Sequence, residues 1–515
     1  MVETKKPETS VEELDFFLKR EAKAKKEEKL KRKSGTNFNE YGYNLISRIQ
    51  VLLFCISLVL IPIALFPLEW NMFEYGRSFV LIFFTALLLT FELIKFFILG
   101  KMEISKSPRD IIFLLLGFSF LISLIFSTDF FVSFWGYEYR FGTGMVSILA
   151  ILIYILILKS TTRDFRTLVT LVSFLNIGFL FSAILSIFSF YGINIFGIIP
   201  EFEKFFLLGL PLFNSFKLSI GVWSVSILLS LFVYYYFFKI FSNDQAYLNK
   251  KVSLINAYRK KRAIQIFLSL VFIFFVTTFL FAISIFSLKV GLWSTIFSLS
   301  FLTFTFLFLV FVSGAKILKF LLIILIPLIL LTFGSIRLTL VQDLLSINTK
   351  NLVEQVTLEN EAIWGITISS LSESLPRALV GLGNDNFVVA YNLYRPAFSG
   401  DVDLNFVNYS YANNEIYNIV SNRGVLGFFI WLITGVIILR QFFQYLTDGS
   451  RKQLLRADSI ENVAIVLLDL LLIYIWLFAL FSYYGFILYF VFFFILVLST
   501  LFKNTYRPNT NRKLK

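Results

Sequence analysis

The sequence predicts an all-α polytopic membrane protein, with about twelve transmembrane helices and one long extracytoplasmic loop before the last three spans. Three observations predict this fold. Of the 515 residues, 57% are hydrophobic and 66 are Phe. The mean hydropathy of +0.79 is far above that of a soluble globular chain. Finally, the apolar residues form separate runs of about 20, the length at which a helix crosses the hydrocarbon core.

The apolar runs divide the chain into membrane segments and polar connections. They lie near 46–66, 78–99, 111–127, 142–159, 166–190, 217–240, 263–283, 289–312, 315–336, 424–444, 461–481 and 485–502. Residues 46–336 are therefore expected to form spans one to nine, and residues 424–502 to form spans ten to twelve. The basic segments 1–45 and 503–515 are expected to be cytoplasmic tails, the first either flexible or a charged helix beside anionic lipid.

Lys and Arg are concentrated in the connections that face the cytoplasm if the N-terminus lies inside. These connections are 101–110, 160–166, 243–263, 313–319 and 448–456. Connections on the other side are poorer in both residues, as the positive-inside rule requires. The net charge of +14 thus reflects orientation in a membrane and argues against a nucleic-acid partner.

The chain has no His, the commonest general base and metal ligand. Its one cysteine, Cys55, lies in an apolar run, so no disulfide framework exists. Any chemistry must therefore use carboxylates, Arg, Lys, Tyr and amides. We expect no cofactor.

Residues 337–423 form the long loop, and their many aromatic residues predict that it is folded. Within it, residues 359–381 carry apolar side chains at helical intervals. This spacing predicts a helix that lies on the membrane or on the bundle and ends near Pro376. The apolar side chains are Ile363, Ile366, Ile368, Leu371 and Leu375.

Several cations lie on the side where the charge rule disfavours them. They are Arg140, Lys289, Arg337, Arg395 and Arg423. Such residues are costly near a membrane mouth unless they are paired or functional. A cluster of them would bind a diphosphate, since Arg makes bidentate contacts with phosphate oxygens. The alternative is that each is an interfacial anchor that extends to water.

Two further segments of the loop carry polar side chains. VGLGNDNF, residues 380–387, contains two glycines that allow close backbone approach, followed by Asp385. Asp401 and Asp403 have a spacing that suits a divalent metal beside a phosphate, or are simply solvated.

YANNEIYNIV opens the approach to the tenth span. Asn413 or Asn414 is expected to cap a short helix, with Glu415 in its first turn and Gly424 at its end. The N–H groups at that helix start would also suit an anion.

Together these segments resemble the O-antigen ligase and O-antigen polymerase family of bacterial membrane enzymes. The resemblance is carried by FWGYEYRFGTG (134–144), by IFSLKVG (285–291), and by the block from Trp364 to NNEIYNIVSNRGVLG (413–427). The predicted number of spans and the position of the long loop agree as well.

The resemblance implies transfer of a glycan from undecaprenyl diphosphate to an acceptor glycan or lipid, without metal or nucleotide, at the bacterial cytoplasmic (inner) membrane. It implies that Arg140 and Lys289 hold the diphosphate, and we add Arg395 and Arg423 to this set. The position of the family's proposed histidine base falls on Asn413, which cannot accept a proton. We therefore expect Glu415 to be the base and Asn413 to position the acceptor. Acceptor contacts are expected from Asn414, Asp385 and Tyr394.

Two other functions remain open on the sequence. One is a glycosyltransferase that uses a polyprenyl monophosphate sugar, with metal bound by Asp401 and Asp403 or by Glu69 and Glu74. The other is a transporter of lipid or polysaccharide with twelve spans. A transporter is less consistent with the large outer loop and with the few acids, such as Asp469, inside the spans.

Overall fold

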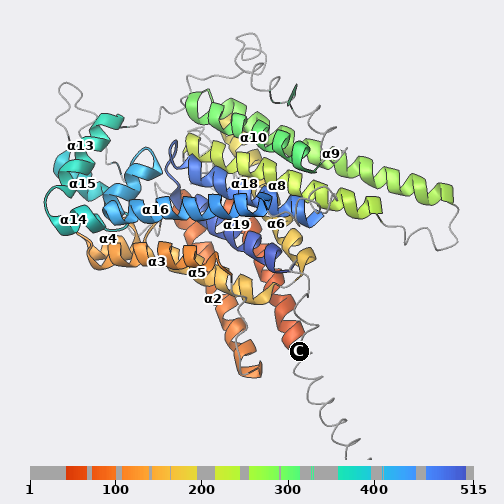
Figure 1. Ribbon diagram of the computed structural model, residues 1–515, viewed down its shortest axis with the longest axis horizontal. Coiled ribbons are helices and arrows are strands. Elements are labelled where there is room, and N and C mark those ends of the chain that lie inside the picture. The colour runs from red at the N-terminus through yellow and green to blue at the C-terminus, as the bar shows by residue number, and fades with distance from the viewer. Residues whose placement is uncertain are drawn as a thin grey trace, which may run out of the picture.

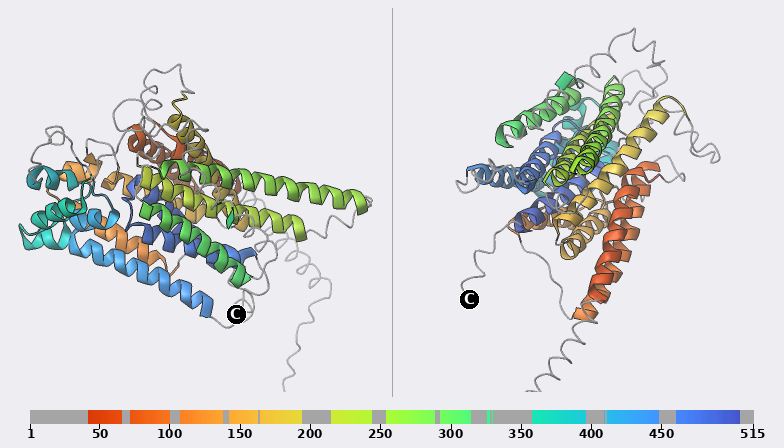
Figure 2. Two further views of the ribbon diagram at one scale, coloured as in Figure 1. Left: turned by 90° about the horizontal axis from the view of Figure 1, so that it is seen from above. Right: turned by 90° about the vertical axis from the view of Figure 1, so that its right-hand side faces the viewer.

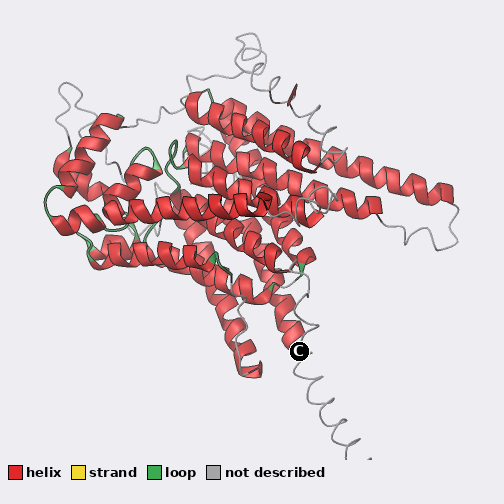
Figure 3. Ribbon diagram, in the orientation of Figure 1, coloured by secondary structure: helices red, strands yellow, loops and turns green. Residues whose placement is uncertain are grey.

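The computed structural model describes residues 42–65, 72–99, 107–137, 142–162, 164–193, 215–243, 254–288, 292–313, 326–327, 329, 358–395, 409, 411–447 and 460–505. These residues are helical apart from short connections, and no strand occurs among them (Figure 3). The predicted all-α fold class is therefore confirmed.

The helices follow the apolar runs of the sequence. After a first helix over Gly42–Ile63 they are α2 (Met72–Leu99), α3 (Asp110–Ile125), α4 (Phe130–Trp135), α5 (Met145–Thr161), α6 (Phe165–Phe190), α8 (Phe216–Asn243), α9 (Leu254–Phe286), α10 (Leu292–Ser313), α13 (Asn360–Leu371), α14 (Leu375–Val380), α15 (Phe387–Tyr394), α16 (Glu415–Thr447), α18 (Ile460–Phe478) and α19 (Gly485–Thr505).

Seven of the described helices are long and apolar enough to cross a membrane: the first helix and α2, α6, α8, α9, α10 and α16. Four shorter apolar helices, α3, α5, α18 and α19, accompany them. The chain is thus an α-helical polytopic membrane protein. Of the twelve runs expected from the sequence, 315–336 lies almost wholly outside the described residues.

Helices α18 and α19 lie at the centre of the bundle (Figure 1). Helix α19 packs against α2, α5, α6, α8 and α18, and its Phe-rich turns are almost entirely buried. Outward-facing side chains of the peripheral helices are large and apolar, such as Phe97 on α2, Leu114 on α3 and Phe267 on α9. This pattern suits helices whose outer face contacts lipid and whose inner face packs against protein.

The two ends of the bundle differ. Helices α13, α14 and α15 gather at one end, beside the start of α16 (Figures 1 and 2). At the opposite end α9 extends beyond its neighbours, because its 33 residues make it about 50 Å long. We call the unit of α13, α14 and α15 the cap, and the end that carries it the cap end.

Helices α3 and α5 are short for spans, with 16 and 17 residues. At 1.5 Å per residue they reach about 24–26 Å, less than the hydrocarbon thickness of about 30 Å.

The cap corrects one expectation. Pro376 does not end a helix but lies in the first turn of α14. Helix α13 stops earlier, at Leu371, and the Ser374 hydroxyl accepts the backbone N–H of Arg377 to start α14. Proline fits the first turn of a helix because the N–H it lacks would be unpaired there. Of the five apolar side chains expected on one helix, Ile363, Ile366 and Leu371 are buried, whereas Ile368 is 44% and Leu375 74% exposed.

Ion pairs also lie away from the cap, and the first two described here connect different helices. Arg109, just before α3, donates from Nη2 to Asp469 Oδ1 of α18 at 2.7 Å, and both side chains are buried. Lys159 of α5 pairs with Asp110. In a third cluster Lys95 pairs with Glu92 on α2 at 3.0 Å.

Candidate functional site

The site is built around a break in α16. Gly424 has φ 63° and ψ −166°, so the helix stops there and resumes as the long apolar segment. At its start the Asn414 side chain accepts the backbone N–H of Tyr417 at 3.0 Å, as an N-cap does. Asn413 instead donates its amide to the backbone oxygen of Leu358. The predicted helix start is therefore confirmed, with Asn414 as the N-cap residue, Glu415 in the first turn and Gly424 at the end of the short helix.

The break frees backbone carbonyls that the cap then uses. The N–H groups of Leu382 and Gly383 donate to the carbonyls of Ser421 and Asn422, each at 3.0 Å. The hydroxyl of Ser123 on α3 also donates to Asn422, at 2.7 Å. These backbone hydrogen bonds require the turn after α14 to lie directly against residues 421–423 of α16. A Cβ atom placed at Gly381 would lie 2.5 Å from the Arg423 nitrogen.

Glu415 is completely buried at the cap end. Its Oε1 accepts from Arg423 Nη2 at 3.2 Å and from the Tyr489 hydroxyl. Its Oε2 accepts the backbone N–H of Tyr484 at 3.1 Å and faces the Asn418 amide at 3.5 Å. Four donors from two helices and a turn therefore surround one carboxylate. Such a set stabilises the ionised form of a buried acid.

Arg423 is also buried, with 5% of its surface exposed. Besides Glu415, its Nη2 donates to the Tyr489 hydroxyl at 2.6 Å. The guanidinium carbon lies 4.4 Å from the ring centroid of Phe120, a cation–π contact. Arg423 therefore joins α16 to α3 and α19.

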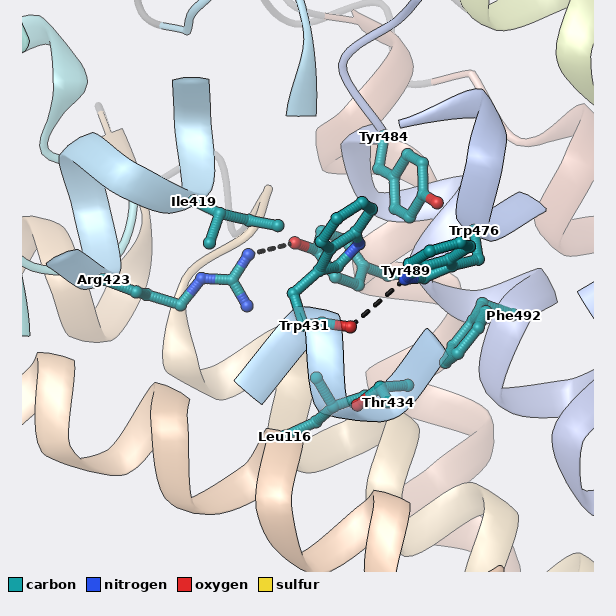
Figure 4. Close-up of a pocket in the computed structure, with 9 residues that line it drawn as sticks. All are labelled: Leu116, Ile419, Arg423, Trp431, Thr434, Trp476, Tyr484, Tyr489 and Phe492. Carbon is teal, nitrogen blue, oxygen red and sulfur yellow. Dashed lines mark hydrogen bonds between the residues drawn. The ribbon is translucent and has the colours of Figure 1, made fainter. Parts of the chain in front are cut away.

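A small pocket lies beside Arg423 (Figure 4). Its wall is mostly aromatic, and Trp476 donates its indole N–H to the Trp431 carbonyl at 3.1 Å. The lining residues are Leu116, Ile419, Arg423, Trp431, Thr434, Trp476, Tyr484, Tyr489 and Phe492. The pocket thus offers one cation and an apolar wall within the span.

Asp385 joins the cap to the connection between α4 and α5. Its backbone has φ 61°, a positive value that no other described residue except glycine adopts. Its Oδ2 accepts the N–H of Tyr137 at 3.2 Å, and its Oδ1 accepts the hydroxyl of Thr143 at 2.7 Å. A Cβ atom placed at Gly142 would lie 3.4 Å from Asp385 Oδ2 and 3.0 Å from Glu74 Oε2. Two carboxylates therefore approach Gly142, one from α2 and one from the turn before α15.

Tyr483 lies among these acids. Its ring stacks on that of Tyr411, with centroids 4.3 Å apart and planes 7° apart. Burial raises the pKa of Tyr483 well above its ordinary value, and the carboxylates of Glu74, Asp385 and Glu415 raise it further. The phenol therefore stays protonated at physiological pH.

The predicted site residues separate into three groups. Glu415, Arg423 and Asp385 lie around the Gly424 break and the cap turn that crosses it. Arg395 is exposed at the C-terminal end of α15, in an environment unlike that of buried Arg423. Tyr394 packs against the small apolar core of the cap. Arg140, Lys289, Arg337, Asp401, Asp403 and Glu69 lie outside the described residues.

Sequence reasoning missed Tyr489, Tyr484 and Asn418. Tyr489 could have been singled out because it lies within the Phe-rich run 485–502, where a buried hydroxyl needs a hydrogen-bond partner. Nothing local indicated that the partner was Glu415. Among the described residues, no group of three or more acidic or Cys side chains is arranged to hold a metal ion.

Comparison with known protein families found no family model that matches this chain, and no curated protein matches it either.

Proposed function

We propose that this protein transfers a glycan from undecaprenyl diphosphate to an acceptor sugar or surface molecule, as a ligase or polymerase of cell-envelope polysaccharide. In this proposal it belongs with the O-antigen ligases and polymerases that its motifs resemble. It acts at the outer face of the bacterial cytoplasmic membrane, with twelve spans, both termini inside and residues 337–423 outside.

One observation carries the proposal. Two of the segments that resemble the family, 134–144 and the block 364–427, are far apart in the chain and meet at Asp385. There the carboxylate accepts from Tyr137 and Thr143 of the first segment. Within the second segment, the backbone of Leu382 pairs with that of Ser421. Weak motifs that converge on one end of a bundle support a shared site better than any of them alone.

The chemistry that this site offers suits a lipid-linked donor. A diphosphate is a good leaving group, so cations that stabilise its developing charge supply much of the catalysis. In the proposal Arg423, which lines the small aromatic pocket, supplies one of these cations. In the proposal Arg140, Lys289 and Arg395 complete the diphosphate site.

A transporter is the second candidate, and one observation favours it. The Arg109–Asp469 pair is buried among the apolar helices, at 2.7 Å. Charges at such depth are costly and often mark the path of a transported ion or substrate. The large cap and the converging motifs lie at the other end of α3, so we rank this candidate lower.

Deletion of the gene separates the two candidates. The transferase predicts that a glycan linked to undecaprenyl diphosphate accumulates and that it is reached by an impermeant glycan-modifying reagent in intact cells. The transporter predicts accumulation of the same lipid where that reagent cannot reach it. No change in surface glycans or in lipid-linked precursors would contradict both.

A further inference from the structure

Helix α16 carries a row of exposed apolar side chains at helical intervals, as one face of a helix requires. The row consists of Val425, Phe429, Ile433, Val436 and Phe443. Because α16 is long and apolar enough to cross a membrane, this exposed face is the one that meets lipid. The start of the row lies directly against α14, since a Cβ atom at Gly424 would lie 2.5 Å from the Leu379 carbonyl carbon.

Helix α14 extends this apolar row past the break in α16. Leu375 and Leu379 lie four residues apart and therefore on one face of α14, and both are exposed. The opposite face is charged, because Arg377 lies about 160–200° around the helix from the two leucines and pairs with Glu373. A helix with leucines on one side and an ion pair on the other suits the boundary between lipid and water.

A second apolar row runs along α3, and α4 continues it (Figure 1). The row on α3 consists of Ile111, Leu114, Phe118, Leu121 and Ile125, all of them exposed. Helix α4 starts soon after α3 ends and exposes Phe130 and Phe131, the second by 67%. These two rings extend the apolar surface of α3 beyond the end of a helix that is itself short for a span.

The two extensions are joined through the backbone. The N–H of Thr128, between α3 and α4, donates to the carbonyl of Leu382, just after α14, at 2.7 Å. Asp129, the charged residue of the α3–α4 connection, accepts the backbone N–H of Val132 at 3.1 Å as the N-cap of α4. Large apolar side chains gathered in this way are unfavourable in water, and a patch of them marks a contact with lipid or with another protein.

We propose that Phe130 and Phe131 of α4 and Leu375 and Leu379 of α14 contact the acyl chains of the bilayer leaflet at the cap end. We call these four residues the lipid edge. Lipid is the occupant because each half of the edge continues a row that already faces lipid, on α3 and on α16. The edge anchors the cap to the membrane beside the break in α16, and this role is independent of the reaction that the site performs.

The test uses the full-length protein in lipid nanodiscs, where both membrane faces are open to soluble reagents. Single cysteines in a Cys55→Ser background carry a nitroxide spin label. Its collisions with oxygen, which partitions into lipid, are compared with its collisions with a water-soluble nickel chelate. Leu379→Cys and Phe131→Cys should give a high ratio of oxygen to nickel collisions, comparable with that of Val436→Cys in the row on α16. Glu373→Cys is the matched control on the charged side of α14 and should give a low ratio.

Two outcomes would overturn the proposal. Ratios at Leu379→Cys and Phe131→Cys as low as that of Glu373→Cys would show that water covers the edge. Labels that neither reagent reaches would show that protein covers it, and dipolar broadening between labels would identify that protein as a second copy of this chain. The two labelled positions lie on different helices, so if one variant fails to fold, the other decides.

Discussion

Gly381 of the cap and Gly424 of α16 lie against each other so closely that neither can carry a side chain. A Cβ atom at Gly424 would lie 2.5 Å from the Leu379 carbonyl carbon and 2.6 Å from the Gly381 nitrogen. Both residues also have positive φ, 78° at Gly381 and 63° at Gly424. This contact joins the cap to the break in α16 and thereby sets the position of Arg423 and of the turn that ends at Asp385.

Gly424→Ala should therefore destabilise the protein. The left-handed backbone alone costs about 1–3 kcal/mol, and the clash with Leu379 adds to it. The measurement is thermal unfolding of purified protein in detergent. Gly365→Ala on α13 is the control, because Gly365 has no neighbour within 4 Å of an added Cβ and Ala favours a helix. Equal melting temperatures for Gly424→Ala and wild type would contradict the account.

The Glu415–Arg423 pair should show strong coupling. Glu415→Gln leaves a buried guanidinium without its counter-charge, and Arg423→Met leaves a buried carboxylate. Each is expected to cost about 3–5 kcal/mol of unfolding free energy. The double variant should cost clearly less than the sum, which a double-mutant cycle in detergent measures. Additive effects would show that the two charges do not stabilise each other.

The Arg109–Asp469 pair should be equally sensitive. Asp469→Asn keeps the shape of the side chain but leaves Arg109 buried without an opposite charge, at a cost of about 3–5 kcal/mol. Asp164→Asn is the control, since Asp164 is exposed and caps α6 without a side-chain hydrogen bond. Unfolding in detergent again gives the comparison. If Asp469→Asn lowers the unfolding free energy no more than Asp164→Asn does, the pair does not stabilise the protein.

The orientation of the chain is testable with single cysteines in a Cys55→Ser background. Ser372 follows α13 and Thr447 ends α16, and both are exposed. An impermeant thiol reagent should label Ser372→Cys in intact cells, because the cap is expected outside the cytoplasm. It should label Thr447→Cys only after the membrane is permeabilised. The reverse pattern would contradict the proposed location of the site.

Local features of the fold could be predicted from the sequence. Apolar runs mark the spans because lipid requires about 20 apolar residues whatever the tertiary structure. The helix N-cap at Asn414 and the helix end at Gly424 were predictable, since both depend on residues within one or two turns. Pro376 was misassigned because proline is compatible with the end of one helix and the first turn of the next. Only the Ser374 hydroxyl, which starts α14, decides between them.

The site itself depends on contacts that no local pattern contains. Tyr489 lies 74 positions after Glu415, and Tyr137 lies 248 positions before Asp385. Arg423 is buried and Arg395 is exposed, although both are arginines of the region before the tenth span. The sequence therefore identifies which polar residues are unusual, but packing determines which of them share an environment.

The proposed glycan transfer is tested most directly by reconstitution of the purified protein with undecaprenyl-diphosphate glycan and its acceptor. The products are measured by mass spectrometry. The account predicts a glycan–acceptor product and one released undecaprenyl diphosphate for each transfer, with Arg423→Gln, if folded, strongly impaired. An intact lipid-linked donor after incubation with folded wild-type protein and a competent acceptor would contradict it.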